Sequence, residues 1–96
     1  MYTIIFLSAF ERDVERYERK ARNSGRLESA LEFLRSGTSL PHSFRDHQLQ
    51  GKMRDFRELH LEGDWLLVYH KDGKKLIITC LWLVTHRKLR ERERKI

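Results

Sequence analysis

Residues 56–84 read FRELHLEGDWLLVYHKDGKKLIITCLWLV and decide the fold. They contain three runs typical of β-strands: Phe56 to Leu61, Trp65 to His70 and Leu76 to Val84. Glu62-Gly63-Asp64 separates the first two, and the Asp-Gly pair in Lys71-Asp72-Gly73-Lys74 favours a tight hairpin between the last two. Three strands joined by two short turns predict an antiparallel meander.

The residues before this stretch predict a strand and two helices. Tyr2 to Leu7 is a compact apolar run that predicts a buried strand. Ser8 and Glu11 have the spacing of a capping box, which predicts a helix from Ser8 to about Arg22, ended by Asn23-Ser24-Gly25. A second apolar stripe from Leu27 to Leu34 predicts another helix, which Gly37 ends, so the two helices form a hairpin.

This order of elements predicts an α+β fold with one mostly antiparallel sheet. The helices are expected on one face of the sheet, which leaves the opposite face available for a ligand. Ninety-six residues suit a single domain over 1–96. Thr38 to Gly51 lacks periodicity and is expected to be a loop, and loops of this length often carry function.

The charge of the chain points to an anionic partner. Lys and Arg number 20 against 14 Asp and Glu, which gives a net charge of +6. Six basic and two acidic residues lie in the tail at 87–96. Such a tail is typical of proteins that bind nucleic acid or ribosomes, and equally of a solvated helix end.

Composition excludes several classes of protein. The longest apolar run, Leu76 to Val84, is far shorter than the roughly 20 residues that span a bilayer, so no membrane segment and a cytoplasmic location are expected. Cys80 is the only cysteine, so an internal disulfide is excluded. The chain has no Cys pair, no His-x-x-x-His helix and no glycine-rich phosphate loop, so neither a metal nor a cofactor is expected.

Histidines near the strands are the residues best suited to chemistry. Two imidazoles on opposite sides of an RNA phosphodiester can act as general base and general acid, because the ribose 2′-hydroxyl supplies the nucleophile. Strand parity places Glu58 and His60 on one face, with Asp64 just beyond the turn. His86 ends the last strand and His47 lies in the long loop, so both are candidates to join them. The alternative is that these polar side chains are simply solvated.

Two segments carry a resemblance to a known family. Residues 44–51, FRDHQLQG, and 56–69, FRELHLEGDWLLVY, closely resemble the YafQ branch of the RelE-like toxins of bacterial toxin–antitoxin pairs, and the similarity continues at Thr85-His86. The resemblance implies a RelE-like fold and a ribosome-dependent, metal-independent endoribonuclease that cuts messenger RNA in the ribosomal A site. It also implies inhibition by a cognate antitoxin, contact with operator DNA only through the antitoxin complex, and no membrane partner.

The resemblance also assigns roles to residues. It implies catalytic positions at His47, His60, Asp64 and His86, with Glu58 as the family's acidic residue. We expect His86 to be the general acid, His60 with Asp64 to be the base or base-orienting pair, and His47 to contact phosphate or transfer a proton, although the roles can be exchanged. The candidate RNA contacts are Arg45, Arg57, Arg87, Lys88 and Arg90, and Arg90 stands where the family has an aromatic residue.

Two other functions remain open at this stage. One is a binding module of the same fold that docks on the ribosome or on gyrase without cleaving RNA. The other is a structural partner that only forms an antitoxin-bound repressor complex. Growth arrest on expression of the chain alone counts against the second of these.

Overall fold

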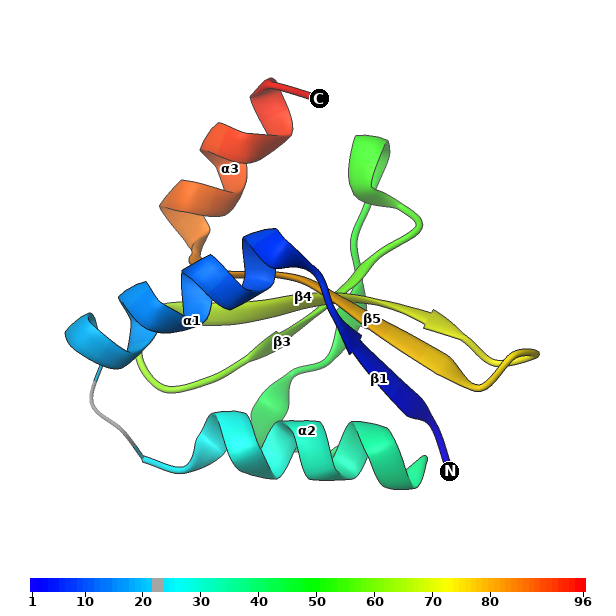
Figure 1. The fold of residues 1–96 in the computed structure, drawn as a ribbon. Helices are drawn as coiled ribbons and strands as arrows, with labels where there is room; N and C mark the ends of the chain where they lie inside the picture. The colour runs from blue at the N-terminus through cyan, green and yellow to red at the C-terminus, as the bar shows by residue number, and fades with distance from the viewer. Residues whose placement is uncertain (22–23) are drawn as a thin grey trace.

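The computed structural model describes residues 1–21 and 24–96, which form a five-stranded sheet with helices on both faces (Figure 1). The strand order is β1-β5-β4-β3-β2, and every neighbouring pair is antiparallel except β1 and β5. The strands are β1 (Thr3–Phe6), β2 (His47–Gln48), β3 (Arg57–His60), β4 (Trp65–Asp72) and β5 (Ile77–Thr85). The helices are α1 (Ser8–Lys20), α2 (Arg26–Ser36) and α3 (His86–Arg94), with short 3-10 helices η1 (His42–Phe44) and η2 (Gly51–Met53).

The predicted α+β architecture is confirmed. The N-terminal strand, the two helices and the three-stranded meander occur in the expected order. Gly37 ends α2 with a left-handed backbone at φ 78°, a conformation that glycine adopts without a side-chain clash. Within the described residues, no helix has the length and apolar content needed to cross a bilayer.

Two predictions about the first strand and helix are wrong. β1 is an edge strand, and Ile5 and Phe6 are 42% and 44% exposed, so the run predicted to be buried is largely open to solvent. Ser8 does not cap α1: Leu7 is the cap residue, and no side chain caps that end. The chain passes directly from β1 into the helix, so Ser8 already has helical geometry. α1 ends at Lys20, and the predicted end at Arg22 and Asn23 lies outside the described residues.

The segment expected to be a loop, residues 38–51, contributes a short strand to the sheet. Within it, His42–Phe44 forms η1 and β2 pairs with β3, which places His47 directly opposite Glu58. The hairpin between β4 and β5 also differs from the expected tight Asp-Gly turn. Asp72 is the last residue of β4, and its carboxylate accepts the N–H groups of Lys74 and Lys75 at 3.1 and 3.0 Å, which stabilises a wider turn.

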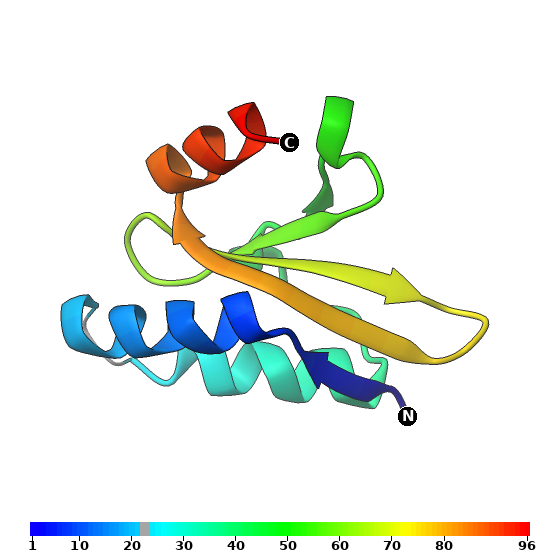
Figure 2. The same ribbon diagram turned by 45° about the horizontal axis from the view of Figure 1, so that its top comes forward.

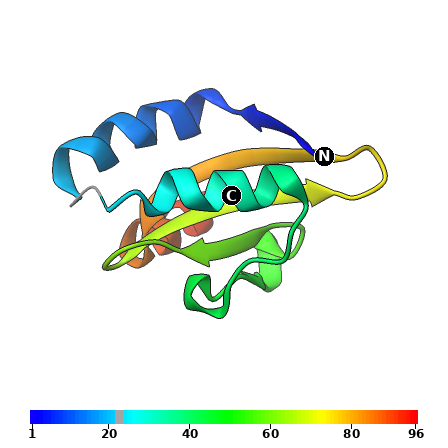
Figure 3. The same ribbon diagram turned by 90° about the horizontal axis from the view of Figure 1, so that it is seen from below.

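The sheet is covered on both faces, not on one. Figure 2 shows α1 and α2 on one side and α3 with η2 on the other, and Figure 3 shows α2 lying across the sheet. Leu89 on α3 packs with Met53, Leu66, Val68 and Val84 in a second core. Of the two interpretations of residues 87–96, the helix end is the one observed: most of the segment belongs to α3, which covers part of the face that was expected to be open.

A β-bulge in β5 interrupts the regular alternation of its side chains between the two cores. Val68 pairs with Trp82 and Tyr69 pairs with Cys80, so Leu81 is an extra residue in β5. Cys80 and Leu83 both belong to the core beneath α1 and α2, although they are three positions apart. Leu81 and Trp82 both pack against the second core.

Candidate active site

Three imidazoles form a row on the sheet face that carries α3. His60 on β3 is central, and its ring centroid lies 6.0 Å from that of His47 and 5.4 Å from that of His86. The fold explains this row. His47 enters it because β2 pairs with β3 at Glu58, two residues before His60. His86 enters it because it is the first residue of α3, immediately after β5.

His47 is held between a carbonyl and a carboxylate. Its Nδ1 lies 2.9 Å from the backbone oxygen of Arg45, which can only accept, so Nδ1 carries the proton and donates. Its Nε2 lies 3.0 Å from Oε1 of Glu58. Glu58 is only 6% exposed and His47 is exposed, so a buried carboxylate orients an imidazole that solvent can reach.

His60 is buried, and its environment keeps it neutral. Nη2 of Arg45 donates to its Nδ1 at 3.1 Å, and its Nε2 is 3.9 Å from Glu58 Oε1. Burial lowers the pKa of His60 below its ordinary value of 6.5; the charges of Arg45, His86 and His47 lower it further, and Asp64 acts in the opposite direction. A neutral imidazole near pH 7 can accept a proton.

His86 and Asp64 form a carboxylate–imidazole pair. The Nδ1 atom of His86 donates to Oδ1 of Asp64, so its Nε2 is free to exchange a proton with a ligand. Thr85 accepts the N–H of Lys88 at 3.3 Å and so caps the helix that begins at His86. The expected pairing of Asp64 with His60 is therefore wrong: the carboxylate contacts His86.

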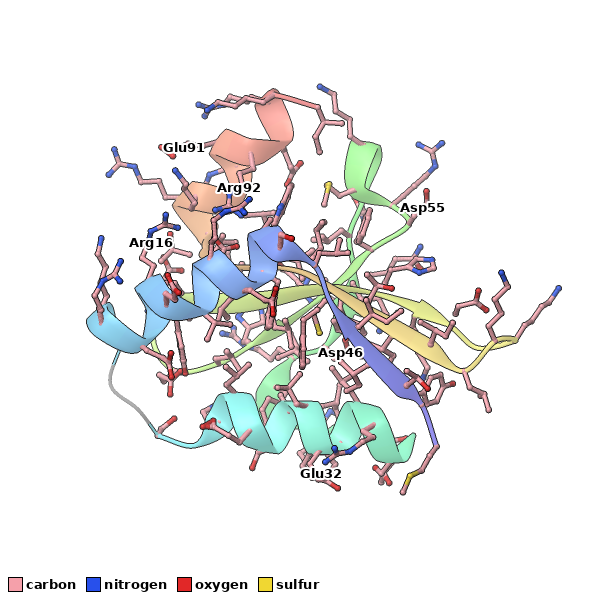
Figure 4. All side chains as sticks on the ribbon, viewed as in Figure 1. Arg16, Glu32, Asp46, Asp55, Glu91 and Arg92 are labelled. Carbon is pink, nitrogen blue, oxygen red and sulfur yellow. The ribbon has the colours of Figure 1, made fainter. Side chains whose placement is uncertain are left out.

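Arg57 and Asp46 lie on the other face of the sheet. Arg57 donates to both carboxylate oxygens of Asp46, at 3.3 and 2.9 Å, and Tyr69 also donates to Asp46 (labelled in Figure 4). The hydrogen bond to Asp46 raises the pKa of Arg57 above its ordinary value, so the guanidinium stays charged and engaged. This arrangement places Arg57 away from the imidazole row, whereas Arg45 contacts it.

The remaining candidate cations are on α3. Arg87, Lys88 and Arg90 are exposed. Lys88 lines a cavity of about 290 Å³ together with Arg16, Lys20, Trp65 and Thr85. Trp65 and Thr85 directly adjoin Asp64 and His86 in sequence and pair across β4 and β5. The cavity therefore adjoins the end of the imidazole row.

Sequence reasoning missed three cations near the site. Arg16 and Lys20 lie in the first predicted helix, and their spacing of four residues places them together on α1. Arg26 on α2 donates to the backbone oxygen of His60 at 3.1 Å and so supports β3 from the opposite face. No pattern in the sequence indicates this last contact, because it joins residues far apart in the chain.

Part of the row could also hold a metal ion. Ligand atoms of His47, Glu58 and His60 all lie within 4.8 Å of one another. Oε2 of Glu58 is buried and, among the described residues, has no hydrogen-bond partner. Two imidazoles and a carboxylate are ligands that suit zinc and copper. The sequence expectation of no metal considered helical and cysteine spacings, and it did not anticipate that β2 would bring His47 to β3.

Comparison with known proteins identifies the family. The family described as "Bacterial toxin of type II toxin-antitoxin system, YafQ" matches residues 2–91. The curated "mRNA interferase toxin YafQ" of Escherichia coli strain K12 is 30% identical over 74 residues, which cover 76% of this chain and 80% of that protein.

Two solved structures are similar over almost the whole chain. A metal-bound toxin from Helicobacter pylori is 29% identical, with a TM-score of 0.83, and the match covers 93% of this chain and 99% of that one. The E. coli DinJ-YafQ toxin-antitoxin complex contains a chain that is 25% identical, with a TM-score of 0.80, and the match covers 92% of this chain and 96% of that one. The chain thus belongs to the YafQ family of bacterial toxins of type II toxin–antitoxin systems.

Proposed function

We propose that this toxin is a ribosome-dependent endoribonuclease that cuts messenger RNA in the ribosomal A site. The observation that carries the proposal is the row of His47, His60 and His86, in which one imidazole is kept neutral and another is backed by a carboxylate. The mRNA interferase of E. coli, which is 30% identical, supports the same activity.

The residues of the row suit attack by the 2′-hydroxyl. His60 accepts the 2′-hydroxyl proton, and the 2′-oxygen forms a bond to the adjacent phosphorus. The bond from phosphorus to the 5′-oxygen of the next nucleotide breaks, and His86 donates a proton from Nε2 to that oxygen. The products are a 2′,3′-cyclic phosphate and a free 5′-hydroxyl. Asp64 holds Nδ1 of His86 and stabilises the imidazolium before it donates its proton.

Arg45 links substrate binding to the base. In the free protein its guanidinium donates to Nδ1 of His60 and so occupies a lone pair of the proposed base. A phosphate is a stronger acceptor for arginine than a neutral imidazole. Arrival of the scissile phosphate therefore draws Arg45 away, which frees Nδ1 and stabilises the charge that develops on the phosphate oxygens.

The proposed partners follow from charge and from the relatives. The net charge of +6 suits ribosomal and messenger RNA, and Lys88 with Arg16 and Lys20 offers contacts to the RNA backbone beyond His86. The DinJ-YafQ toxin-antitoxin complex supports a cognate antitoxin as the partner that inhibits this toxin. We propose that the toxin contacts operator DNA only through that antitoxin.

Primer extension on a defined messenger RNA in a purified translating system tests this function. We expect wild type to give a new cut in the A-site codon only when ribosomes are present. His60→Ala and His86→Ala should weaken the cut at least 100-fold, and His70→Ala, which changes a histidine outside the row, should leave it unchanged. If wild type binds ribosomes but leaves the message intact, the non-cleaving binding module replaces the nuclease. If expression causes no growth effect, only a role in the repressor complex remains.

A second candidate function is binding of a transition metal by His47, Glu58 and His60. Their clustered ligand atoms and the unpartnered Glu58 oxygen favour it, and the H. pylori toxin that carries a metal supports it. Because a metal ion would bind the His60 imidazole that the proposed base step needs, we expect Zn²⁺ or Cu²⁺ to inhibit cleavage and EDTA to restore it. Calorimetric titration with each ion should show binding that His47→Ala removes and His70→Ala retains. Equal binding by both variants would place the metal elsewhere.

A further inference from the structure

Asp13 is a buried carboxylate that the proposed chemistry does not use. It lies on α1 and is only 2% exposed. Arg92 donates to both of its oxygens at 2.8 and 2.7 Å, and the backbone N–H of Leu83 donates to Oδ2 at 3.0 Å. Arg16 approaches it more distantly, at 3.3 Å. A carboxylate this far from water has been desolvated, so its bidentate arginine is the partner that compensates for its burial.

Arg92 lies in the last turn of α3, just beyond the residues that match the family. Its guanidinium stacks over the ring of Trp82, 5.3 Å from the centroid, and its side chain is 20% exposed. Figure 4 shows Arg92 and Arg16 together between α3 and α1. The ion pair therefore joins the C-terminal turn of α3 to the middle of α1, across residues 79 positions apart.

α3 contacts other described parts of the protein near its start, its middle and its end. His86 contacts Asp64 at its first residue, Leu89 is buried in the second core, and Arg92 holds Asp13 near its end. His86 and Arg92 are six residues apart on one helix, which is about 9 Å along its axis. A continuous helix of this length moves as a rigid body, so a change in the anchorage of its last turn alters the direction of its first.

We propose that Asp13 and Arg92 are positioning residues that hold α3 so that His86 remains beside His60. The catalytic part of this inference rests on the proposed nuclease function. The pair itself touches neither RNA nor the reacting atoms; it acts through the helix. The segment that extends past the family match thus completes the geometry of the active site.

The test uses two variants that remove the ion pair in different ways. Arg92→Gln removes the guanidinium, and Asp13→Asn keeps the volume and an oxygen that can still accept the N–H of Leu83. Arg12→Gln, an exposed neighbour of Asp13, is the matched control. Each protein is measured by steady-state cleavage on programmed ribosomes and by NMR contacts between the His60 and His86 rings in the free toxin.

We expect both variants to lower kcat about tenfold, with KM for ribosomes changed less than twofold. The double variant should lose no more than either single one, because the two side chains act as one pair. The His60–His86 contact should weaken in both variants and persist in Arg12→Gln. If kcat is unchanged, or if it falls while the ring contact persists, the positioning role is wrong. If wild type does not cleave, the nuclease proposal fails, and the NMR contact alone decides whether the pair positions His86.

Discussion

At the scale of single residues, His60 sets the pH range in which the toxin can work. Because its pKa lies below 6.5, we expect the acidic limb of the pH–rate profile for kcat/KM to lie below pH 6.5. Arg45→Gln removes the nearest positive charge, so it should raise the pKa of His60 and shift this limb to higher pH. NMR titration of the His60 ring measures the shift directly, and Arg54→Gln, which changes an exposed arginine, is the control. An unchanged titration in Arg45→Gln would contradict the assignment.

The pKa shifts of His60 and Glu62 predict how the stability of the folded protein depends on pH. The unfolded chain binds the His60 proton more readily than the folded protein does, so stability should decline as pH falls below about 6.5. Burial raises the pKa of Glu62, but the hydrogen bonds from Ser24 and Tyr17 together lower it by more, so the pKa lies below its ordinary value of 4.5. Stability from Glu62 is therefore present above pH 4.5 and lost below it. Thermal melting from pH 8 to 3 should show two declines, and Glu62→Gln should reduce only the lower one.

The sequence located the residues of the candidate site but not all of their partners. His60 and Glu58 could be grouped because alternation along a strand is a local property. His47 and His86 were included as candidates, and the pairing of β2 with β3 explains the position of His47. The contact of Asp64 with His86 and that of Asp13 with Arg92 join residues far apart in the chain, and no local pattern encodes them.

At the scale of elements, the junction of α1 with α3 is expected to bind the RNA backbone. The double variant Lys20→Gln with Lys88→Gln removes two cations from the cavity beside Trp65. For single-stranded RNA, each lost phosphate contact reduces the slope of log K against log salt by about 0.7, so the slope should fall by about 1.4. Fluorescence anisotropy with a labelled oligonucleotide measures this slope. Lys74→Gln with Lys75→Gln, in the β4–β5 turn, should leave the slope unchanged.

The predictions for β1 and for residues 87–96 were limited by the same physical cause: local composition does not reveal contacts between distant parts of the chain. The apolar composition of β1 predicted a buried strand. Its place at the edge of the sheet instead depends on parallel pairing with β5, a strand that begins at Ile77. For residues 87–96 the sequence left a nucleic-acid-binding tail and a solvated helix end open, because Leu89 is the only apolar residue among the many charges of α3. Local composition cannot reveal that a single leucine completes a second core.

At the scale of the whole molecule, Leu89 is the apolar contact that joins α3 to the sheet. Leu89→Ala leaves a cavity beside Met53, Leu66 and Val84, so we expect it to lower the free energy of unfolding by about 2–4 kcal/mol. Urea denaturation checks this value, with Ile96→Ala, at an exposed site, as the control. A loss below about 1 kcal/mol would show that α3 contributes little to the folded state.

The bulge at Leu81 limits which changes of chain length this protein can accept. Because Leu81 is the extra residue of β5 and faces the same core as Trp82, its removal would leave a regular ladder in which Trp82 lies opposite Val68 and Cys80 opposite Tyr69. Cys80 and Leu83 would still face one core and Val84 the other, whereas removal of Leu83 would turn Val84 away from its core. Deletion of the codon for residue 81 should therefore be tolerated far better than deletion of the codon for residue 83.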